Sequence, residues 1–199
     1  MNETIELMRA HRSVRRYGEG TVRDEHIAAA VRAGQAAATS SAVQGYCCIR
    51  VTDDAKRAEL ADLAGPQEKV RLAPAFFVIC GDSRRHRIAC GREGVGYDQG
   101  LEAFLVAVID ASLFAQNMTL AFESMGYGTC YIGGLRNDLP RVDRVLGLPE
   151  GVYPLFGLCV GEAKEAPIER PRLGLEAVLM ENGYAGDGVV GAALDEYDE

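Results

Sequence analysis

Apolar residues recur with a helical period in four segments of the chain. In the segments 23–38 and 139–146 they fall on one face, with polar residues on the other, as in amphipathic helices. The segment 3–9 has apolar Ile5, Leu7 and Met8 and ends in a basic run, as a short helix with cations at its C-terminus would. The segment 97–125 is apolar on most of its faces and is interrupted by only a few polar residues. This pattern predicts a long central helix that is buried on most sides, and the interruptions argue against a membrane span.

Four further segments are rich in β-branched, aromatic and apolar residues and are bounded by Gly, Pro or Asp. These segments, which we interpret as strands, are 46–52, 74–81, 129–133 and 153–161. Because helices of unequal length separate the strands, the pattern predicts an α+β fold.

Length and composition are typical of one globular domain. The chain has 199 residues, of which 48% are hydrophobic and 25% charged, and this is enough apolar material for a sizeable core. No run of about 18 apolar residues indicates a membrane span, and the first residues are acidic where a secretory signal would be basic. We therefore expect a single domain over residues 1–199, located in the cytoplasm.

Charge is unevenly distributed along the chain. The formal net charge is −8, and seven of the 29 acidic residues lie from Glu176 onward, where there is no Lys or Arg. The chain ends in a Gly- and Ala-rich acidic tail over about 183–199, and the rest is nearly neutral with its basic residues in bunches, which permits local anion sites. A nucleic-acid-binding domain would usually be basic, so we expect no nucleic-acid partner and no membrane partner.

The six cysteines show no Cys-x-x-Cys pair and no nearby His at metal-ligand spacing, which argues against a zinc site. The run Gly157-Leu-Cys159-Val-Gly161 has the spacing of the turn that carries the nucleophile of many hydrolases. Its flanks, however, form a continuous apolar run, and no histidine lies beside an orienting acid in the order of a triad. We interpret this run as a buried strand and keep a thiol hydrolase as a remote alternative.

A basic motif, His11-Arg12-Ser13-Val14-Arg15-Arg16, follows the first predicted helix. Guanidinium groups offer planar, permanently charged donors that suit a phosphate. A solvated helix end, whose cations complement the helix dipole, fits the spacing about equally well. Taken by itself, the motif leaves both interpretations open.

Other polar or glycine-rich segments are also candidates for binding. The hydroxyl groups of Thr39-Ser40-Ser41 can donate several hydrogen bonds, while Gln67-Glu68-Lys69 and Arg170-Pro171-Arg172 form either solvated surface or walls of an anion pocket. The glycines at 126–134 precede a strand and lack the third glycine of a dinucleotide fingerprint, which argues against that site. The pair Gly133-Gly134 either lets a flat ligand approach the backbone or forms a plain tight turn.

Taken together and in this order, these segments resemble the FMN-dependent nitroreductase family, in particular its oxygen-insensitive NADPH nitroreductases and NADPH-flavin reductases. The resemblance spans nearly the whole chain. The motifs that carry it are Thr4-Ile-Glu-Leu7, His11-Arg-Ser-Val-Arg15, Ala38-Thr-Ser-Ser41, Gln67-Glu-Lys69, Tyr131-Ile-Gly-Gly-Leu-Arg-Asn137, Pro154-Leu-Phe-Gly-Leu-Cys-Val-Gly161, Pro171-Arg172-Leu173 and Glu181-Asn182.

The resemblance implies a mainly antiparallel central sheet flanked by helices, in an intertwined homodimer with two FMN sites at the subunit interface. Thr39 stands where relatives have Ser and Arg170 where they have Lys, so that hydroxyl and charge are kept. The FMN-binding positions that it implies are His11, Arg12, Ser13, Arg15, Thr39, Ser40, Ser41, Gln67, Lys69, Tyr131, Ile132, Gly133, Gly134, Arg170 and Arg172.

The activity implied by the resemblance is hydride transfer from NADPH or NADH via bound FMN to nitroaromatics, quinones or free flavin. The chemistry belongs to the flavin, and no side-chain nucleophile or metal is needed. Family members continue for some tens of residues past the position of Glu199, with basic residues associated with the NADPH phosphate. We therefore expect either a shortened chain or a more open site with a weaker preference for NADPH over NADH. The alternative is a protein that stores or delivers FMN without efficient turnover.

Overall fold

The computed structural model describes residues 2–198. The chain divides into two compact units, Met1–Pro167 and Ile168–Glu199, and each is described by itself. The second unit contains a short 3₁₀ turn, η3 (Leu175–Ala177), and the helix α8 (Asp187–Asp198). The prediction of a single domain over the whole chain therefore stays a prediction.

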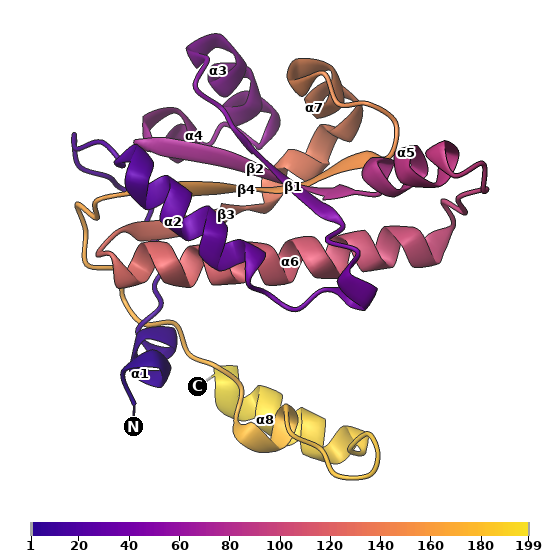
Figure 1. The fold of residues 1–199 in the computed structure, drawn as a ribbon. Coiled ribbons are helices and arrows are strands. Elements are labelled where there is room, and N and C mark those ends of the chain that lie inside the picture. The colour runs from indigo at the N-terminus through magenta and orange to yellow at the C-terminus, as the bar shows by residue number, and fades with distance from the viewer. Residues whose placement is uncertain (1, 199) are drawn as a thin grey trace. The chain divides into compact units, whose positions relative to one another are not determined.

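A four-stranded antiparallel sheet forms the centre of the first unit (Figure 1). Its spatial order is β1 (Tyr46–Arg50), β2 (Ala75–Asp82), β4 (Val152–Gly161) and β3 (Gly128–Ile132). Every residue of β2 is buried, because this inner strand is covered on both faces by helices. The sequence reflects this position, since β2 is a continuous apolar run without alternation.

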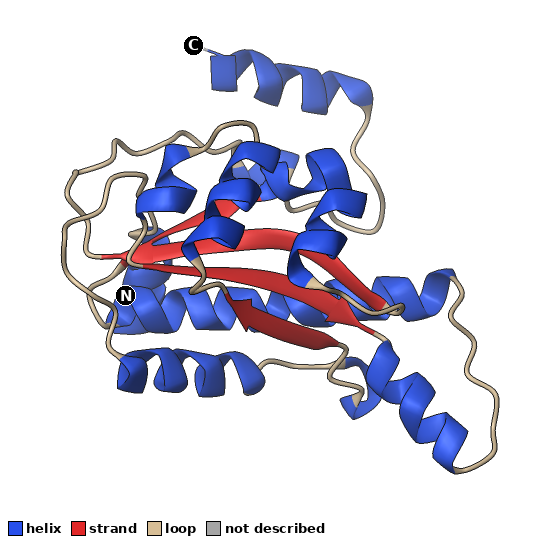
Figure 2. Ribbon diagram, turned by 90° about the horizontal axis from the view of Figure 1, so that it is seen from above, coloured by secondary structure: helices blue, strands red, loops and turns tan. Residues whose placement is uncertain are grey.

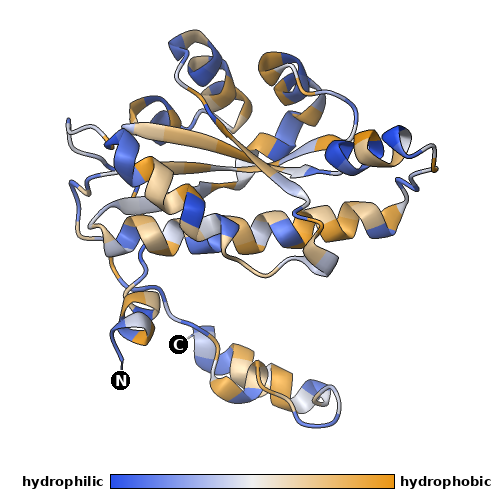
Figure 3. Ribbon diagram, in the orientation of Figure 1, coloured by the Kyte–Doolittle hydropathy of each residue, from blue (hydrophilic) through white to orange (hydrophobic). Residues whose placement is uncertain are grey.

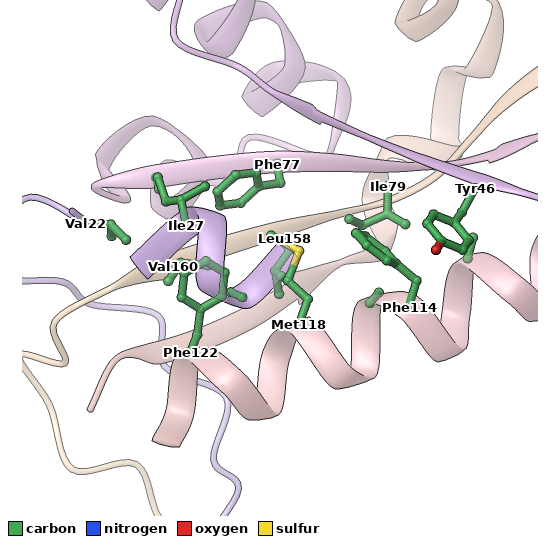
Figure 4. Close-up of a cluster of buried hydrophobic side chains, with 14 of the residues drawn as sticks. Val22, Ile27, Tyr46, Phe77, Ile79, Phe114, Met118, Phe122, Leu158 and Val160 are labelled. Carbon is green, nitrogen blue, oxygen red and sulfur yellow. The ribbon is translucent and has the colours of Figure 1, made fainter. Parts of the chain in front are cut away.

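One face of the sheet packs against α2 (Asp24–Gln35) and α6 (Leu101–Ser124). Figure 4 shows this core, in which Phe114, Met118 and Phe122 of α6 point toward Phe77 and Ile79 of β2. The short N-terminal helix α1 (Glu3–Arg9) also contacts α6. These helices begin and end within a few residues of the predicted segments.

The other face is covered by helices that the sequence patterns did not all predict. They are α3 (Asp54–Leu63), α4 (Glu68–Leu72) and α7 (Leu139–Leu146), which Figure 2 shows from above. Only α7 was expected, and its ends are clear because Asp138 caps its first turn and Gly147 adopts a left-handed conformation after it. The helix α5 (Arg84–Arg92), which follows β2, was also missed, since it is too polar to show an apolar stripe.

Helix α6 is less buried than its sequence predicted. It packs one side against the sheet, but apolar residues lie along its whole length (Figure 3), and part of its outer face is exposed. The exposed residues are Leu101, Phe104, Leu105, Ile109 and Leu113. The expectation of burial on most sides was wrong for this single chain, because no element of the first unit covers that face. By length and composition α6 could also cross a membrane, a test that the core helices of globular proteins pass as well.

Candidate functional site

Only the first part of the basic motif lies at the helix end, where Arg12 Nη1 donates to Arg9 O at 3.1 Å. Helix α1 ends at Arg9, and residues 10–17 form an extended strap along β3. Val14 N donates to Thr129 O at 2.8 Å, and Ser13 forms a β-bridge with Thr129. The strap continues past the end of β4, where the backbone N–H groups of Arg15 and Arg16 donate to Glu165 Oε1. Backbone pairing therefore fixes the position of the backbone from which the side chains of the motif project.

His11 is anchored to the last turn of α6. Its Nδ1 lies 2.6 Å from Glu123 Oε1, which also accepts a hydrogen bond from Thr129 Oγ1 at 2.8 Å. The carboxylate of Glu123 is mostly buried, and its Oε2 has no hydrogen-bond partner among the described residues. Because the carboxylate accepts from Nδ1, the other ring nitrogen of His11 remains available to a ligand. Both residues line a cavity of about 250 Å³ together with Arg12.

The strand end and the Gln67 segment lie against each other. β3 ends at Ile132, and Gly133 and Gly134 begin the 3₁₀ turn η2 (Gly133–Asp138). A Cβ atom on Gly134 would lie far inside van der Waals contact of Ala64 O and 2.9 Å from Gln67 Nε2. Only glycine therefore lets the loop of Gln67 approach the strand end so closely. Gln67 Nε2 donates to Ala64 O at 2.7 Å, which holds the amide beside the glycines.

Two of the predicted cations lie near the same strand. Burial raises the pKa of the Cys130 thiol, and the positive charges of Lys69 and Arg15 both act to lower that pKa. Lys69 comes from α4 and Arg15 from the strap, so both segments bring a positive charge near Cys130, in the middle of β3. The strap, the Gln67–Lys69 segment and the end of β3 thus form one site within the first unit.

A second cavity, of about 350 Å³, opens beside Tyr131 and Gly133. The hydroxyl of Tyr131 accepts a hydrogen bond from Thr119 Oγ1 at 2.9 Å, and burial raises the pKa of this phenol. Sequence reasoning missed three polar residues that line the cavity, Ser112, Gln116 and Arg136. The first two are polar interruptions on the apolar helix α6, a signal that could have marked them.

The Thr39–Ser41 segment lies elsewhere in the same chain. Asp110 holds it, since its Oδ1 accepts from Ser40 N at 3.0 Å and its Oδ2 accepts from Gly45 N at 2.9 Å. Asp110 and Glu123 are thirteen residues apart on α6, which corresponds to about 20 Å along a helix. One copy of the chain therefore does not bring Thr39–Ser41 together with His11.

The strained backbone of the Thr39–Ser41 segment is a further feature. Ser41, Ala42 and Gln44 all have positive φ angles, a conformation that costs free energy in residues other than glycine and is concentrated at functional sites.

Arg170 and Arg172 belong to the second unit, where Arg172 Nη1 donates to Arg170 O and Pro171 O. Their role in the site stays a prediction.

Comparison with known proteins identifies the family of the chain. The model of the family described as "Nitroreductase family" matches residues 8–162. The chain belongs to the nitroreductase family. Among curated proteins, this nitroreductase-family chain is 46% identical over 187 residues to "FMN reductase (NADPH)" of Bacillus subtilis, which covers 92% of this chain and 75% of that protein. It is 45% identical over 184 residues to "NADPH-flavin oxidoreductase" of Vibrio harveyi, with the same coverage.

Solved structures of nitroreductases share the fold. The NfrA1 nitroreductase of Bacillus subtilis superposes with a TM-score of 0.95 at 42% identity, over 98% of this chain and 81% of that one. The NADPH:FMN oxidoreductase of Vibrio harveyi, solved as a complex with NAD⁺, gives a TM-score of 0.90 at 40% identity, over 98% of this chain and 86% of that one. The α+β fold with a mainly antiparallel sheet is thereby confirmed.

The residues present in the first unit fit FMN. The strap offers guanidinium and hydroxyl donors suited to a phosphate, and the backbone at Gly133 and Gly134 is bare where a side chain would hold a flat ring away. The amide of Gln67 beside these glycines supplies donors and an acceptor for the edge of such a ring. Among residues 2–198 no group of three or more potential ligands is placed to hold a metal ion.

Proposed function

We propose that this chain is an FMN-dependent oxidoreductase that passes hydride from NADPH or NADH to nitroaromatics, quinones or free flavin. The observation that carries the proposal is the convergence on β3 of the strap, the Gln67–Lys69 segment and the Gly133–Gly134 turn. Bound FMN would supply the hydride chemistry. The names of the relatives, which include an oxygen-insensitive NADPH nitroreductase of Salmonella typhimurium, support this assignment.

The side chains of the strap would bind the phosphate. Arg12, Ser13 and Arg15 would hold it by charge-assisted hydrogen bonds, and we assign Arg170 and Arg172 to the same anion as a second cationic pair. His11 is oriented by Glu123, so that its second ring nitrogen can donate to or accept from the cofactor.

The strand end would receive the ring. The run Tyr131–Gly134 would lie against one face of the ring, because its glycines leave the backbone bare. Gln67 and Lys69 would hold the ring edge, where their donors stabilise negative charge that develops during reduction. No side chain of the chain acts as a nucleophile in this scheme, so the buried Cys159 has no part in it.

We propose that the site is completed by a second copy of the chain. Thr39, Ser40 and Ser41 lie about 20 Å along α6 from the His11 anchor, so they would reach the cofactor of the partner subunit. The exposed apolar face of α6, with Phe104, Ile109 and Leu113, supplies a surface that a homodimer would bury. The two FMN sites would then lie at the subunit interface.

The location and partners follow from charge and cysteine chemistry. All six cysteines are free thiols, as expected in a reducing compartment, and we place the enzyme in the cytoplasm. With a net charge of −8, we propose that it acts on small molecules and takes neither nucleic acid nor membrane as a partner.

An absorbance spectrum of the purified chain tests the proposal. A flavin band that is bleached anaerobically by NADPH or NADH supports the reductase, and the faster donor shows the nucleotide preference. A flavin band that neither nucleotide bleaches would instead support the alternative of an FMN-storing or FMN-delivering protein. The absence of a flavin band even after addition of FMN contradicts both.

A further inference from the structure

Two pairs of cysteines face each other across neighbouring strands. Cys47 of β1 is paired in register with Cys80 of β2, and Cys130 of β3 with Cys159 of β4. All four belong to, or pack against, the core on the same face of the sheet. None of them is used by the proposed reaction, and all are present as free thiols.

The backbone places Cys47 and Cys80 at a distance that a disulfide can span. At the two ends of the β1–β2 ladder, Asp82 N donates to Gly45 O and Val51 N donates to Phe76 O. Hydrogen-bonded pairs alternate along an antiparallel ladder, so Cys47 and Cys80 also form a hydrogen-bonded pair, with Cα atoms about 5.5 Å apart. This value lies within the range found for disulfides.

The two thiols of this pair differ in exposure and in acidity. Cys47 is half-buried, whereas Cys80 is fully buried. A hydrogen bond with the thiol of Cys80 lowers the pKa of Cys47, while burial and the charge of Asp82 act against this shift and the charge of Arg85 acts with it. The same hydrogen bond and burial raise the pKa of Cys80. Cys47 is therefore the better nucleophile, and Cys80 is the proton donor beside it.

Arg85 is held in place beside the first residue of β1. Its Nε donates to Asp82 Oδ2 at 2.8 Å, and its Nη2 donates to the carbonyl oxygen of Tyr46. The guanidinium is thereby fixed beside the residue that precedes Cys47. Tyr46 itself stacks on Phe114 (Figure 4) on the other face of the sheet, where Cys48 and not the thiol of Cys47 borders an open pocket of about 270 Å³.

We propose that Cys47 and Cys80 are a peroxide-sensitive dithiol that closes to a disulfide between β1 and β2. The Cys47 thiolate attacks one oxygen of hydrogen peroxide, forming an S–O bond and breaking the O–O bond, and the second oxygen leaves as water after taking a proton. Cys80 sulfur then attacks the sulfenic sulfur of Cys47, and the S–O oxygen leaves as a second water with the proton of Cys80. Two thiols are oxidised by two electrons in all, and one peroxide is reduced to two waters.

The second pair serves as an internal contrast. Cys130 and Cys159 are 3% and 0% exposed, and burial raises the pKa of both thiols. Neither a thiolate nor access for peroxide is therefore available at that pair. Cys48 adjoins Cys47 but packs against the core on the other face of the sheet, and burial raises its pKa to about 12.

Thiol counting on the full chain tests the proposal. The reduced protein is treated with a small excess of hydrogen peroxide, and the thiols are counted in denaturant before and after. We expect a loss of two of the six thiols, which dithiothreitol reverses, and a tryptic cross-link between the peptides 33–50 and 72–84. An unchanged thiol count, or a link between Cys130 and Cys159, overturns the proposal.

Variants assign the link to individual cysteines, because Cys47 and Cys48 share one tryptic peptide. Cys47→Ser should abolish the link, and Cys80→Ala should leave a sulfenic acid at Cys47 that dimedone traps. Cys48→Ser and Cys90→Ser are matched controls that should link as the unchanged protein does. Circular dichroism before treatment shows that each variant is folded. A link that survives in Cys47→Ser, or one that Cys48→Ser removes, contradicts the assignment.

Discussion

His11 Nδ1 lies 2.6 Å from Glu123 Oε1, and this contact joins the N-terminal strap to the last turn of α6. The same carboxylate oxygen accepts from Thr129 Oγ1 of β3 at 2.8 Å. One acidic side chain thus connects a strap, a helix and a strand that lie far apart in the sequence. The position of the basic motif depends on it.

Replacement of Glu123 should therefore loosen the strap. Glu123→Ala leaves His11 and Thr129 without their shared acceptor, and we expect the free energy of unfolding to fall by about 1–3 kcal/mol. FMN affinity should fall as well, because His11 is no longer oriented. Urea denaturation and FMN titration measure the two effects. Glu123→Gln, which keeps an acceptor oxygen, should show a smaller loss of stability, and an equal loss in both variants would falsify the role of the hydrogen bonds.

Two neighbouring arginines of the strap should differ in their effect on FMN binding. Arg15→Gln removes a positive charge that lies near enough to β3 to lower the pKa of Cys130. We expect FMN affinity to fall by roughly tenfold or more, as for the loss of a charge-assisted hydrogen bond. Arg16 is the matched control, since its side chain is 82% exposed and its Nε lies 4.0 Å from Glu165 Oε2. Arg16→Gln should change FMN affinity by less than about twofold. Quenching of FMN fluorescence on binding gives both values, and similar losses would contradict the assignment.

The contact between Gly134 and the Gln67 loop predicts a strong effect of a single methyl group. Gly134→Ala forces its Cβ into Ala64 O and Gln67 Nε2, and we expect a loss of about 1–3 kcal/mol in stability together with weaker FMN binding. Gly91→Ala is the control, because Gly91 lies in α5 with no atom within 4 Å of an added Cβ. That variant should be neutral or slightly more stable. Thermal denaturation compares the two, and a stable Gly134→Ala protein with normal FMN affinity would refute the close approach.

A site shared between two copies predicts complementation between variants. We expect Arg15→Gln and a Ser40→Ala, Ser41→Ala double variant each to bind FMN weakly. After unfolding and refolding as a mixture, half of the dimers are heterodimers with one intact site, so about a quarter of all sites should regain normal affinity. FMN titration of the mixture against the separately refolded variants measures this gain. No gain in a mixture shown to contain heterodimers would place all FMN-binding residues in one subunit.

The half-buried thiol of Cys48 predicts a loss of stability in alkaline solution. Burial raises the pKa of this thiol from 9.0 to about 12. Between these values the native state keeps a proton that the unfolded state has released, so the free energy of unfolding falls as the pH rises from about 9 toward 12. Below pH 9 the thiol is protonated in both the native and the unfolded state, and its full contribution to the free energy of unfolding is present. Cys48→Ala should reduce the drop in urea midpoint between pH 8 and pH 10.5, whereas Cys90→Ala should leave it unchanged. An equal drop in all three proteins would rule out Cys48 as a cause.

The sequence by itself determined the order and kind of the main elements. The four strands and the helices α1, α2, α6 and α7 lie where hydrophobic periodicity predicted them, because that period follows from the local geometry of helix and strand. The sequence patterns did not predict the helices α3, α4 and α5. Of these, α4 is short and α5 is dominated by charged residues. The family resemblance needed only the motifs and their order, and no single motif was specific enough alone.

Only the tertiary structure decided which of these segments meet. The strap reaches β3 through backbone pairing with Thr129, and Gln67 reaches Gly134 because a missing Cβ lets the chain approach closely. The separation of Thr39–Ser41 from His11 depends on which turns of α6 carry Asp110 and Glu123. The facing thiols of Cys47 and Cys80 follow from strand register. Such relationships join residues distant in sequence, and they are set by packing and register, which no local pattern encodes.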